Sequence, residues 1–277
     1  MTVLVLGSGG AKGWAHIGVI KRLLELNIKL DLIVGSSIGA IIGAFLASGK
    51  FDILIQKITD LSITEIKDLI LDFKIPNRGF LQGDRIYKWL SQPDILGNIK
   101  FTDLKIPLIV TGTNMFSEKS TVLFSDKHTF KNKTEFFKEA STELFTDETV
   151  TNALRVSYSI PGIFEPVKKN NMILVDGGIA NQLPTNIAKA FGATKIIAVD
   201  LNLSLDLQND AGLFAMLFQT IDFTKKQISD LTHELYPADI LIAPDVKHVR
   251  TLSLNDGHDV IKIGYDCACK VLNDNNI

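Results

Sequence analysis

The chain has 277 residues, 46% of them hydrophobic, and its 29 basic and 31 acidic residues give a formal net charge of −2. This length and apolar content allow a sizeable core, so we expect one domain over residues 1–277, with at most a subdomain. No basic stripe stands out, which argues against a nucleic-acid-binding protein.

The N-terminus and the cysteines indicate a compartment. The first residues lack the basic region of a signal peptide, and no apolar run reaches the ~20 residues of a membrane span. Cys267 and Cys269 are spaced for neither a disulfide nor a zinc knuckle, so we expect reduced structural thiols. The sequence therefore predicts a cytoplasmic protein, and this prediction is compatible with peripheral contact with a membrane.

The chain begins with an apolar strand at residues 2–6, the glycine-rich run Gly7–Gly13 and a helix with a broad apolar face. A second apolar strand at 32–34 completes a parallel β-α-β unit. A dinucleotide fingerprint would need a third glycine where this chain has Lys12, and an acid where it has Gly35. A phosphate-binding P-loop needs Gly-Lys-Ser/Thr, which the run does not contain.

The remaining interpretation of the glycine run is an oxyanion hole. Consecutive glycines leave backbone N–H groups unobstructed above the neighbouring strand, where they can bind developing negative charge. Lys12 either adds positive charge and pins this loop, or is an ordinary solvated lysine.

The second strand runs into a Gly-x-Ser-x-Gly motif formed by Gly35, Ser37 and Gly39. In such a motif the serine stands on a sharp strand-to-helix turn, and the glycines remove Cβ atoms that would clash. The helix N-terminus beside it favours negative charge. Ser37 is thus a candidate nucleophile; the alternative is a glycine turn that merely lets a helix approach the sheet.

Residues 51–71 have helical apolar spacing and are followed by a loop at 77–83 and a short helix. This block either covers the site as a lid or pads the core. A strand at 107–114 follows, and residues 121–124 are expected to pair with it after a turn near 117–119. The more polar stretch 127–149 is either an excursion that meets lipid or a source of core contacts. Its aromatic residues are Phe130, Phe136, Phe137 and Phe145.

A helix at 151–159 ends at Pro161, and an apolar strand at 172–175 leads into Asp176-Gly177-Gly178. A carboxylate at the carboxyl end of a strand stands where α/β sheets place ligands and catalytic groups. The alternative is a turn aspartate that makes an Asx hydrogen bond.

The rest of the chain continues the alternation of strands and helices. The expected elements are a helix at 185–191, a strand at 195–201, a long helix at 211–231, a strand at 239–244 and a helix at 257–272. This alternation predicts a three-layer αβα fold with a mostly parallel central sheet and helices on both faces. We expect the C-terminal helices of residues 210–277 to pack on a core formed by residues 3–200.

Four segments, in this order, resemble the patatin-like phospholipase family. They are Gly7–Gly13, Gly35–Ala40, Ser157–Val167, and Asp176–Gly178 with the nearby Asn181, Leu183 and Pro184. One such segment would be weak, but four in order are specific. The chain departs from the family's pattern at Ser8, where glycine is usual.

This resemblance implies site residues. Ser37 would be the nucleophile and Asp176 its general base, a dyad without histidine, with the amides of Gly9, Gly10 and Ala11 as the oxyanion hole. The supporting motif residues would be Gly7, Ser8, Lys12, Gly13, Gly35, Gly39, Gly177 and Gly178. Independently, the elbow follows only the second strand, too early for an ordinary α/β-hydrolase, and the five histidines stand in no triad-like context.

The expected function is a serine acyl hydrolase that cleaves carboxylic esters of phospholipids or lysophospholipids through an acyl-enzyme. It would need no cofactor or metal, and its partners would be lipid and, transiently, a membrane or micelle surface. Two alternatives remain: an acyltransferase that uses the same dyad and an alcohol or thiol acceptor, and a non-catalytic lipid-binding or regulatory protein.

Overall fold

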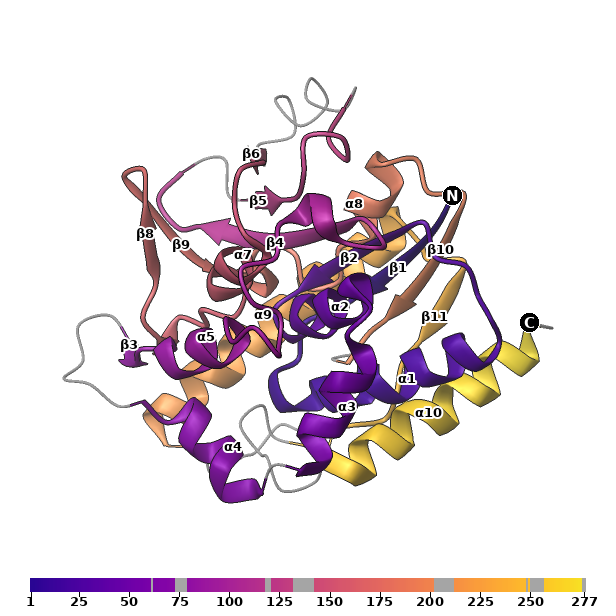
Figure 1. Ribbon diagram of the computed structural model, residues 1–277, viewed down its shortest axis with the longest axis horizontal. Coiled ribbons are helices and arrows are strands. Elements are labelled where there is room, and N and C mark those ends of the chain that lie inside the picture. The colour runs from indigo at the N-terminus through magenta and orange to yellow at the C-terminus, as the bar shows by residue number, and fades with distance from the viewer. Residues whose placement is uncertain are drawn as a thin grey trace.

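The computed structural model describes residues 1–60, 62–72, 79–117, 121–131, 142–201, 212–247, 249 and 257–275 (Figure 1). The strands are β1 Thr2–Leu6, β2 Leu32–Ser36, β3 Gly79–Leu81, β4 Leu108–Asn114, β5 Thr121–Phe124, β6 Thr142–Phe145, β7 Gly162–Phe164, β8 Val167–Lys169, β9 Met172–Asp176, β10 Lys195–Val199 and β11 Ile240–Ile242. The helices are α1 Trp14–Glu25, α2 Ile38–Ser48, α3 Phe51–Asp60, α4 Ile63–Ile70, α5 Asp84–Leu90, α7 Val150–Ser157, α8 Thr185–Ala190, α9 Leu213–Leu235 and α10 Gly257–Asp274. Short 3₁₀ turns are η1 Gly10–Gly13, η2 Phe101–Asp103 and η3 Gly177–Ile179.

The central sheet has the order β11-β10-β1-β2-β4-β5-β6, with β9 also paired to β4 and β8 to β9. The five strands from β11 to β4 are parallel, whereas β5 and β9 run antiparallel to β4. The predicted α/β class with a mostly parallel sheet is therefore confirmed.

Two strands share one edge of β4. Residues 33–36 of β2 pair with the first half of β4, and residues 174–176 of β9 pair with its second half in the opposite direction. Because β5 occupies the other edge, β2 and β9 lie end to end and their carboxyl ends meet beside the middle of β4.

The core lies on both faces of this sheet. Alternate residues of β1 divide between the faces, with Leu4 and Leu6 in one apolar cluster and Val3 and Val5 in the other. The first cluster includes side chains of α1, α2 and α10, and the second includes those of α8. Figure 1 shows α9, in orange, crossing behind the sheet, while α2 and α3 lie in front.

The structure refines the middle of the chain. The expected helical stretch 51–71 is two helices, and Ser62 and Glu65 form a capping box at the start of the second. Part of the expected loop at 77–83 is wrong, because Gly79–Leu81 is a strand paired with β7, while residues 77 and 78 lie outside the described residues.

The aromatic residues of 127–149 that are described make core contacts. Phe130 packs on Phe191 and Phe145 stacks on Phe124, which favours the core interpretation of those two side chains. Phe136 and Phe137, and most of the turn expected near 117–119, lie outside the described residues.

Candidate active site

The turn after β2 holds Ser37 in a strained conformation. Its φ of 54° lies in the left-handed region, which a non-glycine residue adopts only when the surroundings enforce it. The flanking glycines make the turn possible: a Cβ on Gly35 would lie 2.5 Å from Cα of Ala40, and one on Gly39 would lie 2.3 Å from the Leu6 carbonyl oxygen. The turn therefore presents the Ser37 hydroxyl at the end of β2, beside the start of α2.

Asp176 ends β9 and is held by several hydrogen bonds. Its backbone N–H donates to the Ser159 carbonyl oxygen at 2.9 Å, and its own carbonyl oxygen accepts from the Thr113 hydroxyl at 2.9 Å. Its Oδ1 accepts from the Gly178 N–H at 2.7 Å, so the Asx turn considered from the sequence is present as well. These contacts fix the carboxylate and leave Oδ2 directed at Ser37.

The structure brings the two predicted residues together. The Ser37 hydroxyl donates to Asp176 Oδ2 at 2.5 Å, and both side chains are buried. Burial raises the pKa of Asp176 above its usual range, against the opposing effects of the Lys225 charge and of hydrogen bonds from Ser37 and Gly178. A raised pKa makes the carboxylate a stronger base than an exposed aspartate.

The glycine loop is fixed by its first residues. Gly7 donates its N–H to Val199 at 3.1 Å and Ser8 donates to Gln182 at 3.0 Å. His16 lies buried beneath the loop with Nε2 2.8 Å from the Gly7 carbonyl oxygen, and burial lowers the pKa of His16 to about 4, so the ring is neutral at pH 7.

The second part of the loop faces Ser37. Gly10 and Ala11, two of the three expected oxyanion donors, line the same cavity as Ser37, and Gly9 precedes them at the start of the 3₁₀ turn. Gly13 approaches α2 so closely that a Cβ there would lie 2.1 Å from Ile38. The loop is thus packed against the elbow, as an oxyanion hole requires.

Lys12 is 7% exposed, so its interpretation as a solvated surface lysine is wrong. Its positive charge lowers the pKa of Asp222 on α9, although burial, the largest effect, raises that pKa. The charge of Lys225, also on α9, opposes the effect of burial and lowers the pKa of both Asp222 and Asp176. α9 therefore lies near enough to the candidate active site for its charges to affect Asp176, a relationship that the sequence does not reveal.

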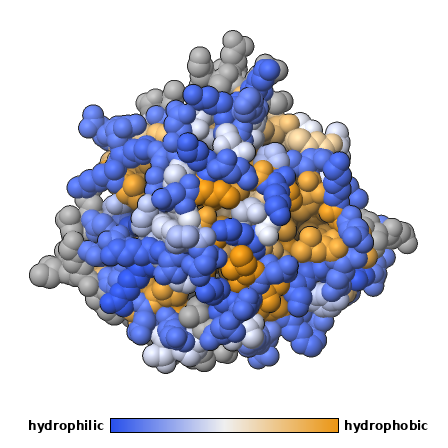
Figure 2. Space-filling view, viewed as in Figure 1, coloured by the Kyte–Doolittle hydropathy of each residue, from blue (hydrophilic) through white to orange (hydrophobic). Residues whose placement is uncertain are grey.

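An apolar cavity of about 200 Å³ opens beside Ser37. Its walls come from the glycine loop and from α2, α3, α4 and α5, including Ile41, Ile58, Ile70 and Trp89. Figure 2 shows that the face with α2 and α3 in front is mainly hydrophilic, with apolar side chains gathered near its centre. The block 51–90 therefore builds a wall of the site as well as padding the core.

Ser157 is a supporting residue whose role the sequence did not reveal. Its hydroxyl accepts the backbone N–H of Ser37 at 2.9 Å and so satisfies a buried donor at the strained turn. Ser37 and Ser157 are 120 residues apart in the sequence, so this contact forms only in the folded protein.

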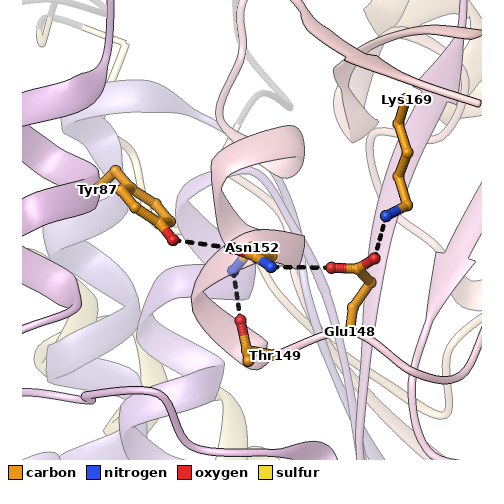
Figure 3. A network of polar contacts seen from close by, with 5 residues as sticks. All are labelled: Tyr87, Glu148, Thr149, Asn152 and Lys169. Carbon is orange, nitrogen blue, oxygen red and sulfur yellow. Dashed lines mark hydrogen bonds and ion pairs between the residues drawn. The ribbon is translucent and has the colours of Figure 1, made fainter.

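The helix that carries Ser157 is anchored by the polar network of Figure 3. At the start of α7, Asn152 accepts from Tyr87 on α5 at 2.9 Å and donates to Glu148 at 3.0 Å. Glu148 forms an ion pair with Lys169 on β8, and the Thr149 hydroxyl caps the helix by accepting the Asn152 N–H. This network joins α5, α7 and β8.

The remaining candidate side chains of the sequence are two cysteines and the histidines. Cys267 and Cys269 are free thiols, and His248 lies outside the described residues. Within the described ranges, no group of three or more His, Cys, Asp or Glu side chains is arranged to hold a metal ion. No helix in the described part of the chain has both the length and the apolar character needed to cross a bilayer.

The fold and the site together define an α/β protein with a serine elbow, a glycine-rich loop and a buried carboxylate. A model of the patatin-like phospholipase family matches residues 4–189. The chain therefore belongs to the patatin-like phospholipase family.

Individual relatives are similar over part of their length. An uncharacterised NTE family protein of Mycobacterium tuberculosis is 33% identical over 199 residues, which are 72% of this chain and 48% of the relative. The neuropathy target esterase of Drosophila melanogaster is 30% identical over 203 residues, which are 72% of this chain and 13% of that protein. The chain thus spans about half the length of the mycobacterial relative that it matches.

A solved structure shows the same fold. VipD from Legionella pneumophila superimposes with a TM-score of 0.54 over 99% of this chain and 66% of that one. At 14% sequence identity, this likeness concerns the fold alone.

Proposed function

We propose that the protein is a serine acyl hydrolase that cleaves carboxylic ester bonds of phospholipids or lysophospholipids. The observation that carries this proposal is the 2.5 Å hydrogen bond from the Ser37 hydroxyl to Asp176 at the wall of an apolar cavity. The hydroxyl is paired with a buried base, and the cavity offers an acyl chain an apolar environment. Membership of a phospholipase family supports the same conclusion.

In the first half of the reaction, the Ser37 Oγ attacks the ester carbonyl carbon and its proton passes to Asp176 Oδ2. The carbonyl oxygen becomes an oxyanion, which the N–H groups of Gly9, Gly10 and Ala11 bind; each such donor contributes about 10²–10³ in rate. Collapse of this intermediate breaks the bond to the alcohol oxygen, which takes the proton from Asp176. The acyl group remains on Ser37 as an ester.

In the second half, water attacks the acyl-enzyme. Asp176 accepts a proton from that water, the same amides bind the second oxyanion, and the fatty acid leaves as Ser37 regains its proton. The raised pKa of Asp176 supports both proton transfers, since the base must be stronger than an ordinary carboxylate.

The proposal is tested by incubating the protein with a mixed lipid extract and measuring products by mass spectrometry. Fatty acid and the corresponding lyso-lipid or deacylated product are expected, and the Ser37→Ala protein should produce neither. Added alcohol or thiol acceptors distinguish hydrolysis from acyl transfer, because a transferase forms the new ester from the alcohol or the new thioester from the thiol. A fluorophosphonate probe that fails to label the wild-type serine would indicate a non-catalytic lipid-binding protein.

A further inference from the structure

Helix α9 exposes several large apolar side chains on its outward side. The side chains of α9 that are described and exposed include Phe223, Leu231 and Leu235, which are 51%, 60% and 72% exposed. Met216 and Ile228 are exposed on the same helix, and Tyr236 follows its end. With 100° between successive residues, these five α9 side chains lie on one side of the helix.

Among the α9 residues whose side chains are described, those on the opposite side, which faces the protein, are mostly polar. Ser229 is 4% exposed, and Asp222, Lys225 and His233 are partly buried. In an ordinary surface helix, the apolar side packs on the core and the polar side meets water. The reversal in α9 leaves a long apolar row uncovered, which in soluble proteins marks an interaction site.

The same helix lies near the catalytic centre. Burial raises the pKa of both Asp176 and Asp222, and against it the charge of Lys225 lowers the pKa of both groups and that of Lys12 lowers the pKa of Asp222, so the polar side of α9 is turned toward the region of the dyad and the glycine loop.

We propose that this row, Met216, Phe223, Ile228, Leu231 and Leu235, docks the protein on a lipid surface, an inference that rests on the proposed function. The substrate of that function is an amphiphile that assembles into membranes or micelles. The lipid surface that would cover the apolar row therefore also contains the substrate. A 23-residue helix is about 35 Å long, and its exposed side suits an extended surface better than a small partner pocket.

The charges of α9 indicate which lipid surface it fits. The exposed side carries Asp230 and Glu234, and Lys226 pairs with Asp230 at 2.5 Å. There is no excess of positive charge to attract anionic lipid. Docking therefore depends on apolar insertion, and zwitterionic phosphatidylcholine vesicles should suffice.

The test measures partition onto phosphatidylcholine vesicles by co-sedimentation, using Ser37→Ala protein so that the vesicles stay intact. The doubly substituted F223S/L231S protein should partition at least about tenfold more weakly, the factor expected for loss of one large apolar contact. The matched control is Leu24→Ser, which removes a half-exposed leucine from α1 on the other side of the sheet and should partition like its parent. Equal partition of F223S/L231S and its parent would overturn the proposal.

A spectroscopic measurement locates the contact independently. The emission of a Leu231→Trp protein should shift to the blue on addition of the vesicles by more than that of a Leu24→Trp protein. Equal shifts in the two proteins would overturn the proposal. It would also be overturned if the wild-type protein does not bind vesicles but forms a dimer that the F223S/L231S substitutions dissociate.

Activity separates this inference from the proposed function. With catalytically intact protein, F223S/L231S should lose hydrolysis of vesicle lipid about tenfold while cleaving a water-soluble p-nitrophenyl ester like wild type. If no ester is cleaved but α9-dependent vesicle binding persists, the proposed function fails and the docking surface stands. If esters are cleaved but F223S/L231S binds vesicles as well as its parent does, only the proposed docking surface fails.

Discussion

Ser36 and Asp176 occupy consecutive positions along one edge of β4, Ser36 opposite Thr111 and Asp176 opposite Gly112, on strands that run toward each other. The residue after Ser36 is Ser37, so the two strand ends bring hydroxyl and carboxylate together without a long loop. Main-chain pairing in a rigid sheet therefore sets the position of the proposed base relative to the nucleophile.

The first prediction concerns the dyad. Ser37→Ala and Asp176→Asn should each reduce ester cleavage by at least about four orders of magnitude, because each removes one partner of a unit that acts together. Steady-state assays with a soluble ester measure the loss, and circular dichroism checks that the fold remains. Near-normal turnover by Asp176→Asn would contradict the dyad.

The second prediction links Asp176 to stability. Since burial raises its pKa in the folded protein above the ordinary 3.8, the folded state binds the proton more tightly than the unfolded state. Its ionisation therefore destabilises the fold as pH rises from about 3.8 through the raised pKa. Asp176→Asn cannot ionise, so its thermal midpoint should exceed that of wild type at pH 7 and approach it at pH below 3.8. Ser37→Ala, which keeps the carboxylate, should retain the wild-type direction of pH dependence.

The third prediction concerns Ser157. Ser157→Ala leaves the buried N–H of Ser37 without its acceptor, a loss that costs about 1–3 kcal/mol and should lower kcat about tenfold to a hundredfold if the turn relaxes. Ser48→Ala also removes a buried hydroxyl, but one that bonds to Phe45 within α2, and it should leave kcat unchanged. Equal kcat values for the two variants would show that Ser157 does not position the elbow.

The fourth prediction concerns the close approach at the elbow. Gly39→Ala places a Cβ 2.3 Å from the Leu6 carbonyl oxygen, a clash with backbone that should destabilise the fold by about 3 kcal/mol or more. Gly212→Ala is the matched control, because a Cβ there has nothing within 4 Å. Thermal denaturation should show a large loss for the first variant and almost none for the second.

The fifth prediction concerns the apolar cavity. Ile58→Trp adds volume to its α3 wall and should reduce cleavage of long-chain esters relative to butyryl esters. Gln56→Trp places the same side chain at an exposed position of α3 and should leave the chain-length profile as in wild type. An unchanged profile in both proteins would mean that the acyl chain lies elsewhere.

The sequence predicts local structure well where one short segment suffices. The apolar run before Gly35 and the glycine spacing around Ser37 specify the strand, turn and helix, because each acts through neighbours in the chain. The sequence does not indicate a strand at Gly79–Leu81, because its partner β7 is about 80 residues away along the chain. The direction of β9 likewise depends on pairing with β4 and has no local signal.

The polar supports of the site were hidden for the same reason. Ser157 begins one of the family-like segments, but neither it nor Thr113 carries a sequence signal for its partner. Only the packed fold gives them the Ser37 N–H and the Asp176 carbonyl oxygen. The apolar spacing in α9 predicts a helix but not which of its sides faces the protein. The reason is that such a pattern does not specify whether the apolar side packs on the core or on another surface.

The end-to-end meeting of β2 and β9 also has a consequence for biosynthesis. The hydroxyl of Ser37 leaves the ribosome 139 residues before the carboxylate of Asp176, and the two meet only when β9 has joined β4. Domains fold as units during synthesis, so a nascent or truncated chain that ends before residue 172 holds a serine with no base. The proposed ester hydrolysis therefore cannot begin at a cellular membrane until β9 has been synthesised and has paired with β4.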